Sequence, residues 1–163
     1  MATRRHGREW ALQMLVQSDL NPGMDLDSTI PKFWKQQWTC KIEEKKDRGE
    51  NIDENNGSIE NQVAPQKIRI FSEVLVRGVS SHIDELDAKI SKYAKNWSIN
   101  RIGSVERNVL RLAFYELLHA PDVPPPVVIN EAIDLAKYFS NADAGRFVNG
   151  ILDQLNRDLR NKR

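Results

Sequence analysis

Apolar residues recur at intervals of three and four along almost the whole chain, which is the spacing of one face of an α-helix. The pattern is clearest between residues 66 and 93, where it consists of Ile68, Phe71, Leu75, Val79, Ile83, Leu86 and Ile90. No segment shows the apolar–polar alternation of a half-buried strand, and no βαβ rhythm is visible. We therefore expect an all-α fold with short connections, built as two packed helical groups rather than one regular bundle.

The same spacing predicts about six to seven helices. They cover residues 4–20, 26–40, 66–93, 104–120, 127–140 and 143–159. Three of them begin at residues of the kind that caps helices, namely Thr3, Ser104 and Asp143. Pro31 should interrupt the second helix, because proline lacks the backbone N–H that an interior position uses, and Gly78 is a candidate break in the third.

One segment lacks this pattern. Residues 41–62 hold seven acidic and four basic residues and almost nothing apolar, so they cannot contribute to a packed core. We expect a polar, mobile insertion over residues 41–64, within a single domain that spans residues 1–163. The segment 41–62 carries a net charge of −3 while the whole chain carries +1, so the rest of the chain has a basic excess, which gathers at its two ends.

Composition and motifs exclude several classes of protein. The single cysteine, Cys40, rules out an intramolecular disulfide and a multi-cysteine metal site. No apolar run could span a bilayer and no secretory signal is visible, so we expect a cytoplasmic protein without membrane contact. The three histidines are scattered: His6 lies among arginines, His82 inside a predicted helix and His119 at a helix end. Without a nucleophile–base pair, a metal-ligand motif or a phosphate-binding loop, the residues predict no enzyme, no cofactor and no metal site.

The first predicted helix begins with arginines, although the N–H groups of a helix start carry partial positive charge and disfavour cations. On a helical wheel Arg4 and Arg8 fall on the broad face of the apolar stripe, and Arg5 lies at its edge. Guanidinium groups bind phosphate through two parallel hydrogen bonds, so an anionic ligand such as RNA would offset this cost. RNA bases also need aromatic faces, for which Phe139 and Phe147 are candidates, although both fit a core-facing stripe equally well.

A second candidate surface lies in residues 100–111, NRIGSVERNVLR. Arg107 and Arg111 are like charges four residues apart, a mildly destabilising pair unless Glu106 or the carboxylate of a partner compensates. The simpler interpretation is a solvated helix face, on which Glu106 complements the helix dipole.

Three long stretches hold the most specific patterns: RRHGREWALQMLVQ, NWSINRIGSVERNVLRLAFYELL and DVPPPVVINEAIDLAKYFSNADAGRFVNGILDQL. In order and spacing they resemble the NusB family of transcription antitermination factors, over the N-terminal helix and essentially all of residues 66–156. The resemblance implies an all-α fold of two packed three-helix subdomains and a role without catalysis. That role is to bind the boxA element of ribosomal RNA leader transcripts together with the small-subunit ribosomal protein NusE. The complex helps RNA polymerase read through terminators.

The resemblance also implies, position by position, which residues serve each partner. The RNA-facing residues would be Arg4, Arg5, Arg8, Phe139, Asn141, Asp143 and Phe147. The surface for NusE would include Tyr93, Arg101 and Glu106. The implied partners are single-stranded boxA-type RNA, NusE and the RNA polymerase antitermination complex, and a homodimer stays open.

Two other interpretations remain open on the sequence. One is a helical protein-interaction module that acts in ribosome biogenesis without direct RNA binding. The other follows from the resemblance, because the same helical fold also occurs fused to ribosomal RNA cytosine methyltransferases. A catalytic role of that kind would need another polypeptide, since this chain shows no nucleotide-binding βαβ unit and no second cysteine.

Overall fold

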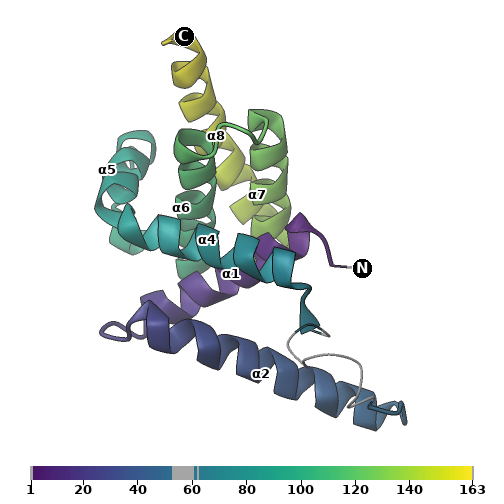
Figure 1. The fold of residues 1–163 in the computed structure, drawn as a ribbon. Coiled ribbons are helices and arrows are strands. Elements are labelled where there is room, and N and C mark those ends of the chain that lie inside the picture. The colour runs from purple at the N-terminus through teal and green to yellow at the C-terminus, as the bar shows by residue number, and fades with distance from the viewer. Residues whose placement is uncertain (1, 53–60, 62, 163) are drawn as a thin grey trace. The chain divides into compact units, whose positions relative to one another are not determined.

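The computed structural model describes residues 2–52, 61 and 63–162, and its regular structure is helical (Figure 1). Its elements are α1 (Arg4–Leu20), α2 (Leu26–Asp47), α4 (Gln66–Ser81), α5 (Ile83–Tyr93), the 3-10 helix η1 (Ile99–Arg101), α6 (Ser104–His119), α7 (Pro125–Phe139) and α8 (Ala142–Asn161). These residues form seven α-helices and no strand, which confirms the all-α prediction. No helix in this part of the chain has the length and apolar character needed to cross a membrane. The chain divides into two compact units, Met1–Val74 and Leu75–Arg163.

The first unit contains α1, α2 and the first half of α4, and an aromatic cluster holds it together. The ring of Trp34 meets that of Trp10 at a centroid distance of 5.5 Å and that of Phe33 at 5.2 Å, both edge to face. Nε1 of Trp34 donates a 2.8 Å hydrogen bond to Oε1 of Glu73. A buried indole whose N–H is satisfied in this way ties α2 to both other helices.

Pro31 lies inside α2 without interrupting it, so the predicted interruption is wrong. The proline sits in the second turn, where a backbone N–H at its position would donate to the carbonyl oxygen of Asp27. Asp27 is exposed, so that carbonyl can bond to water instead and the cost of the proline stays small.

The second half of α2 runs into the segment for which we expected a mobile insertion. The helix continues to Asp47, so residues 41–47 are helical. Lysine and glutamate have high helix propensity, and Lys45 and Lys46 in the last turn complement the helix dipole. Much of the remaining insertion, residues 53–60 and 62, lies outside the described residues.

In the second unit α6 is the central helix, and α5, α7 and α8 pack around it (Figure 1). Its buried residues are therefore spread around the helix and are not confined to one stripe. They are Asn108, Val109, Leu110, Arg111, Leu112, Ala113, Phe114 and Glu116. This unit thus has one more helix around its core than the three-helix subdomain that the resemblance implies.

Arg111 overturns the prediction of a solvated helix face on α6. Its buried guanidinium bonds both carboxylate oxygens of Asp87 on α5, with Nε 2.7 Å from Oδ1 and Nη2 2.8 Å from Oδ2. Arg107 donates to the backbone oxygens of Ile102 and Ile99, at 2.9 and 3.2 Å. Both arginines therefore hold this unit together, because paired guanidinium donors satisfy polar groups that burial would otherwise leave costly.

Several helix ends differ from the predicted ones. The long helix predicted over residues 66–93 breaks at His82 instead of Gly78, since α4 ends at Ser81 and α5 begins at Ile83. The N-cap of α6 is Gly103 instead of the adjacent Ser104. The N-cap of α8 is Asn141 instead of Asp143, because Oδ1 of Asn141 accepts a 2.8 Å hydrogen bond from the backbone N–H of Ala144.

Candidate nucleic-acid interface

The first turn of α1 is capped without any acidic residue. Thr3 is the N-cap, as predicted, and its backbone N–H donates a 3.0 Å hydrogen bond to Nδ1 of His6. His6 thus takes the part that glutamate usually has in a capping box. Arg4 and Arg5 are exposed in this turn, where no carboxylate of the turn offsets the positive end of the helix dipole.

Phe71 on α4 contacts two of the three arginines predicted to face RNA. The guanidinium carbons of Arg4 and Arg8 lie 5.2 and 5.4 Å from the centroid of its ring, within the range of cation–π contacts. Arg8 is only 4% exposed, whereas Arg4 is exposed. The structure thus separates the cluster into two exposed arginines and one packed arginine, Arg8.

Two small residues allow α1 and α4 to approach closely at this place. A Cβ added at Gly7 would lie 2.6 Å from Cδ1 of Phe71, closer than real contacts allow. The buried hydroxyl of Ser72 donates a 2.8 Å hydrogen bond to the carbonyl oxygen of Gly7. Neither residue was among the predicted site residues, although a glycine inside a predicted helix costs about 1 kcal/mol relative to alanine and often has a packing reason.

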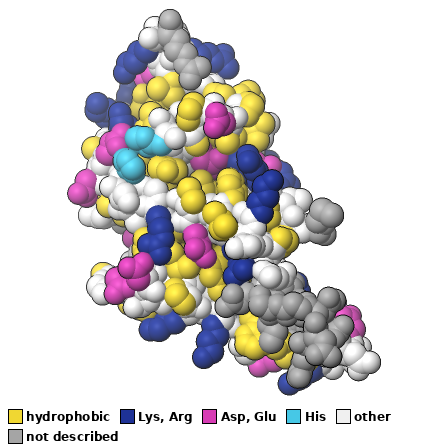
Figure 2. Space-filling model, viewed as in Figure 1, with side chains coloured by type: hydrophobic (Ala, Val, Ile, Leu, Met, Phe, Trp, Pro, Cys, Tyr) yellow, Lys and Arg dark blue, Asp and Glu magenta, His cyan; other side chains and the backbone are white. Residues whose placement is uncertain are grey.

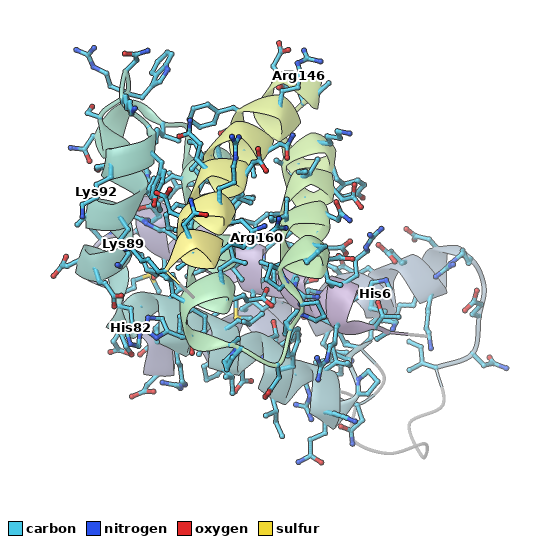
Figure 3. All side chains as sticks on the ribbon, turned by 90° about the horizontal axis from the view of Figure 1, so that it is seen from above. His6, His82, Lys89, Lys92, Arg146 and Arg160 are labelled. Atoms are coloured by element: carbon cyan, nitrogen blue, oxygen red, sulfur yellow. The ribbon has the colours of Figure 1, made fainter. Side chains whose placement is uncertain are left out.

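In the second unit the other residues predicted to face RNA lie around the junction of α7 and α8. Asn141 caps α8, and Asp143 in its first turn forms an ion pair with Arg146 one turn later. Both partners of this pair are exposed, and Arg146 projects away from the helix (Figure 3). Phe147, the next residue, is half-buried.

A pocket of about 350 Å³ brings predicted RNA-facing and NusE-facing residues together in this unit. Its lining comprises Trp97, Arg101, Ile102, Gly103, Glu106, Asn141, Asp143, Ala144 and Phe147. The residues come from the turn after α5, from η1, from the start of α6 and from the start of α8. Five of the predicted site residues, dispersed over residues 101–147, thus share one concave surface.

Glu106 shapes one side of this pocket. Its Oε1 accepts a 2.6 Å hydrogen bond from the hydroxyl of Ser140, which lies just after α7. Its other carboxylate oxygen lies so close to Gly103 that a Cβ there would collide with it. The carboxylate therefore connects the start of α6 to the α7–α8 junction and presents negative charge beside Arg101 in the pocket lining.

Phe139 and Tyr93 are not part of that pocket lining. The half-buried ring of Phe139 packs edge to face against Tyr138, at 4.9 Å, and Tyr138 is 79% exposed. The hydroxyl of Tyr93 donates a 2.7 Å hydrogen bond to Asp158 on α8. Burial and this carboxylate raise the pKa of Tyr93 from 10.0 to about 12. Tyr93 instead lines a pocket of about 400 Å³ that also includes Lys92.

The sequence profile of the NusB family matches residues 5–157. The chain belongs to the NusB family. The transcription antitermination protein NusB of Geobacter sp. (strain M21) is 40% identical to it over 155 residues, which cover 95% of this chain and 94% of that protein. The named relatives are transcription antitermination proteins, so the family is one of non-enzymatic factors.

Solved NusB structures share the fold. The NusB of T. maritima has a TM-score of 0.71 and 32% sequence identity, covering 94% of this chain and 89% of that one. A chain in the crystal structure of the antitermination factors NusB and NusE in complex with dsRNA has a TM-score of 0.70 and 29% identity, covering 95% and 96%. The expected NusB-like fold is therefore confirmed.

Two exposed residues of this NusB-family chain were missing from the predicted site. Trp97, 54% exposed, lines the pocket with Phe147 and lies in the polar turn NWSIN. An aromatic residue in a polar connection was the available signal, because loops carry binding residues more often than packing residues. Arg146 stands three positions after Asp143, the spacing of an ion pair on one helix face.

Proposed function

We propose that this chain binds the boxA element of single-stranded ribosomal RNA leader transcripts together with NusE. It does so in the cytoplasm, as part of the RNA polymerase antitermination complex, and helps the polymerase read through terminators. Membership of the NusB family supports this function. The solved complex in which a similar chain is bound to NusE and dsRNA supports NusE and RNA as partners.

The observation that carries the proposal is the pocket at the start of α8. Phe147 and Trp97 offer aromatic surface, on which a nucleobase can stack. Asn141 has an amide with a donor and an acceptor, and the carboxylate of Asp143 accepts hydrogen bonds from base amino groups. Single-stranded RNA is read in this way, by stacking combined with hydrogen bonds to base edges.

The phosphates are assigned to the exposed arginines of the first unit, Arg4 and Arg5. A guanidinium fork forms two charge-assisted hydrogen bonds with a phosphate, and the positive end of the α1 dipole adds to the attraction. Arg8 contributes indirectly, because it packs on the same Phe71 ring as Arg4 and restricts that ring's position. Phe139, beside the exposed Tyr138, is the second stacking candidate.

The surface that binds NusE is assigned to Tyr93, Arg101 and Glu106. Arg101 and Glu106 carry opposite charges in one pocket lining, so they can select the orientation of a complementary partner. Tyr93 lies in a second pocket, whose lining holds the cations Lys92, Lys95 and Arg157 and one carboxylate, Asp158. A partner surface with carboxylates would fit these groups.

An electrophoretic mobility shift assay tests the proposal directly. The full chain, with and without NusE, is titrated with single-stranded boxA RNA, a scrambled strand and the corresponding duplex. We expect preferential binding of the boxA strand, strengthened by NusE. The double variant Arg4→Gln/Arg5→Gln should bind more weakly, and its salt dependence should fall by about 0.7 per lost phosphate contact, or about 1.4 in all.

The matched control is Arg160→Gln/Lys162→Gln, which also removes two positive charges, from exposed residues at the end of α8. Its affinity and salt dependence should equal those of the unmodified chain. Equal loss in both variants would mean that only net charge matters. An unchanged salt dependence in the double variant would remove Arg4 and Arg5 from the interface.

The alternative, an interaction module in ribosome biogenesis without RNA contact, predicts a different result. The chain would then bind NusE, but the boxA strand would show no mobility shift either with or without NusE. The carboxylates of Glu106 and Asp143 in the pocket favour this alternative, because they repel phosphates. Phe147→Leu keeps apolar volume but removes the aromatic face, so a loss of RNA affinity of about tenfold with NusE binding intact would support base stacking.

A further inference from the structure

His82, Glu85 and His119 converge on the surface of the second unit, although the sequence scatters them. His82 lies between α4 and α5, Glu85 lies in the first turn of α5, and His119 is the last residue of α6. One potential ligand atom from each lies within 4.8 Å of the others. Figure 2 shows histidine side chains beside acidic side chains on this face, Figure 3 labels His82, and the rings of His82 and His119 lie 4.3 Å apart. Along the sequence the three histidines are poorly placed for a metal site, whereas the fold brings His82 and His119 together.

The distances fit a small tetrahedral ion. Nε2 of His119 and Oε2 of Glu85 are 3.4 Å apart. Ligand atoms about 2.0–2.1 Å from zinc at tetrahedral angles lie about 3.3–3.4 Å from one another, so this pair already has the required spacing. The ligand atoms all lie within 4.8 Å of one another, and rotation of the exposed side chains of Glu85 and His119 can bring them to this spacing.

A backbone hydrogen bond holds His82 in an orientation suited to metal binding. Nδ1 of His82 lies 2.8 Å from the carbonyl oxygen of Gly78, an acceptor, so Nδ1 carries the proton and Nε2 presents its lone pair. Such a backbone carbonyl behind a histidine is the usual support of a metal ligand. The ring of Tyr115 flanks both imidazoles, with centroids 5.7 Å from His82 and 5.4 Å from His119.

Gly78 also lets the ring of Tyr115 pack beside the two histidines. A Cβ at this position would collide with the ring of Tyr115, so only glycine lets that ring pack against α4 beside the histidines. The two imidazoles lie 4.3 Å apart, so one ion can reach both rings and the Glu85 carboxylate beside them.

We propose that His82, Glu85 and His119 bind a divalent transition-metal ion, with Zn²⁺ as the best fit. Two imidazole nitrogens and one carboxylate favour zinc over the hard ions Mg²⁺ and Ca²⁺, which prefer oxygen ligands. Water occupies the fourth position. The ion fastens the α4–α5 corner to the end of α6. Glu106, in the first turn of α6, is about 20 Å away along the helix, so this site is separate from the proposed RNA pocket.

Metal titrations of the full chain test the proposal. The Cys40→Ser background is used, because the exposed thiol of Cys40 is itself a potential ligand. Co²⁺ is added while visible absorption is recorded, and Zn²⁺ affinity is measured by competition with a chromogenic chelator. We expect one equivalent to bind, with the absorption of a four-coordinate site, and Zn²⁺ to raise the unfolding temperature.

Variants separate this site from unspecific binding. His119→Ala and Glu85→Gln should each weaken Zn²⁺ binding by at least about tenfold and abolish the thermal shift. Asp84→Asn, which neutralises the exposed neighbour of Glu85, and His6→Gln, which removes the histidine of α1, should leave both unchanged. Because both loss variants alter exposed side chains, circular dichroism should show an intact helical fold.

Three results would overturn the assignment. They are the absence of saturable binding, affinity retained in His119→Ala, and equal weakening in Asp84→Asn and Glu85→Gln. A further experiment measures the affinity for boxA RNA with and without Zn²⁺. RNA affinity independent of the metal, together with loss of Zn²⁺ binding in His119→Ala, is the expected result for a structural ion.

Discussion

At the scale of single residues, two glycines inside helices have opposite surroundings. A Cβ at Gly7 would press on the ring of Phe71, whereas a Cβ at Gly150 would meet nothing within 4 Å. Alanine raises helix propensity by about 1 kcal/mol at either site. At Gly7, however, the ring contacted by Arg4 and Arg8 must move, an overpacking cost of about 1–3 kcal/mol. Gly7→Ala should therefore lower the free energy of unfolding, measured with urea.

Gly150→Ala is the matched control for that experiment. Gly150 is exposed inside α8, so the alanine should stabilise the chain by about 0.5–1 kcal/mol. If both substitutions stabilise the chain equally, the close approach of α1 and α4 does not constrain residue 7. If Gly7→Ala alone destabilises it, RNA affinity should fall as well, because Phe71 can no longer hold Arg4 in place.

The phenol of Tyr93 and its hydrogen bond to Asp158 should make the stability of the fold depend on pH. Burial and the contact with Asp158 raise its pKa from 10.0 to about 12, so folding favours the neutral phenol. The stability that this phenol contributes is complete below pH 10 and is lost as the pH rises towards 12. A spectrophotometric titration of tyrosinate should show one late step near pH 12, which Tyr93→Phe removes. In Asp158→Asn the step should move to lower pH but stay above 10, because burial remains.

At the scale of elements, Asn141 at the start of α8 has one structural role and one proposed binding role. Its side-chain oxygen caps the helix, and its amide faces the pocket proposed for RNA. Asn141→Ala should lower the free energy of unfolding by about 1 kcal/mol through the lost cap, measured with urea. Asn141→Asp keeps a capping oxygen and adds a favourable negative charge at the helix start, so stability should be retained.

A measurement of RNA affinity distinguishes the capping role of Asn141 from its proposed RNA-binding role. If the amide donates to a base, Asn141→Asp should lose RNA affinity although its stability is unchanged, because the donor is gone and a carboxylate has been added. Full RNA affinity in Asn141→Asp would make Asn141 a capping residue only.

The elements also show where local reasoning succeeds. The bounds of α1 agree with the prediction from the sequence, because its cap and its apolar spacing are local properties of residues 3–20. Burial of single side chains could not be predicted in the same way. Arg111 was expected on a solvated face, but α6 is covered around its circumference and Asp87, 24 residues earlier, neutralises the guanidinium. That pairing depends on how α5 packs on α6, which no periodicity within α6 encodes.

At the scale of the whole molecule, the proposal assigns RNA contacts to both units. Photocrosslinking of the full chain and NusE to a short boxA RNA, followed by peptide identification, should yield peptides from the start of α1 and from residues 138–147. The scrambled strand should give neither set above background. If peptides come from one unit only, the RNA contacts assigned to the other unit are wrong.

The sequence by itself determined the all-α class, the approximate helix positions and the family resemblance, which the profile match over residues 5–157 bears out. Helical periodicity, capping and long motifs are properties of neighbouring residues, so they can be read along the chain. Only the tertiary structure decided that Arg8 is packed on Phe71, that five predicted residues share one pocket, and that His82 meets His119. These features depend on contacts between residues far apart in sequence, and such contacts form only when helices pack.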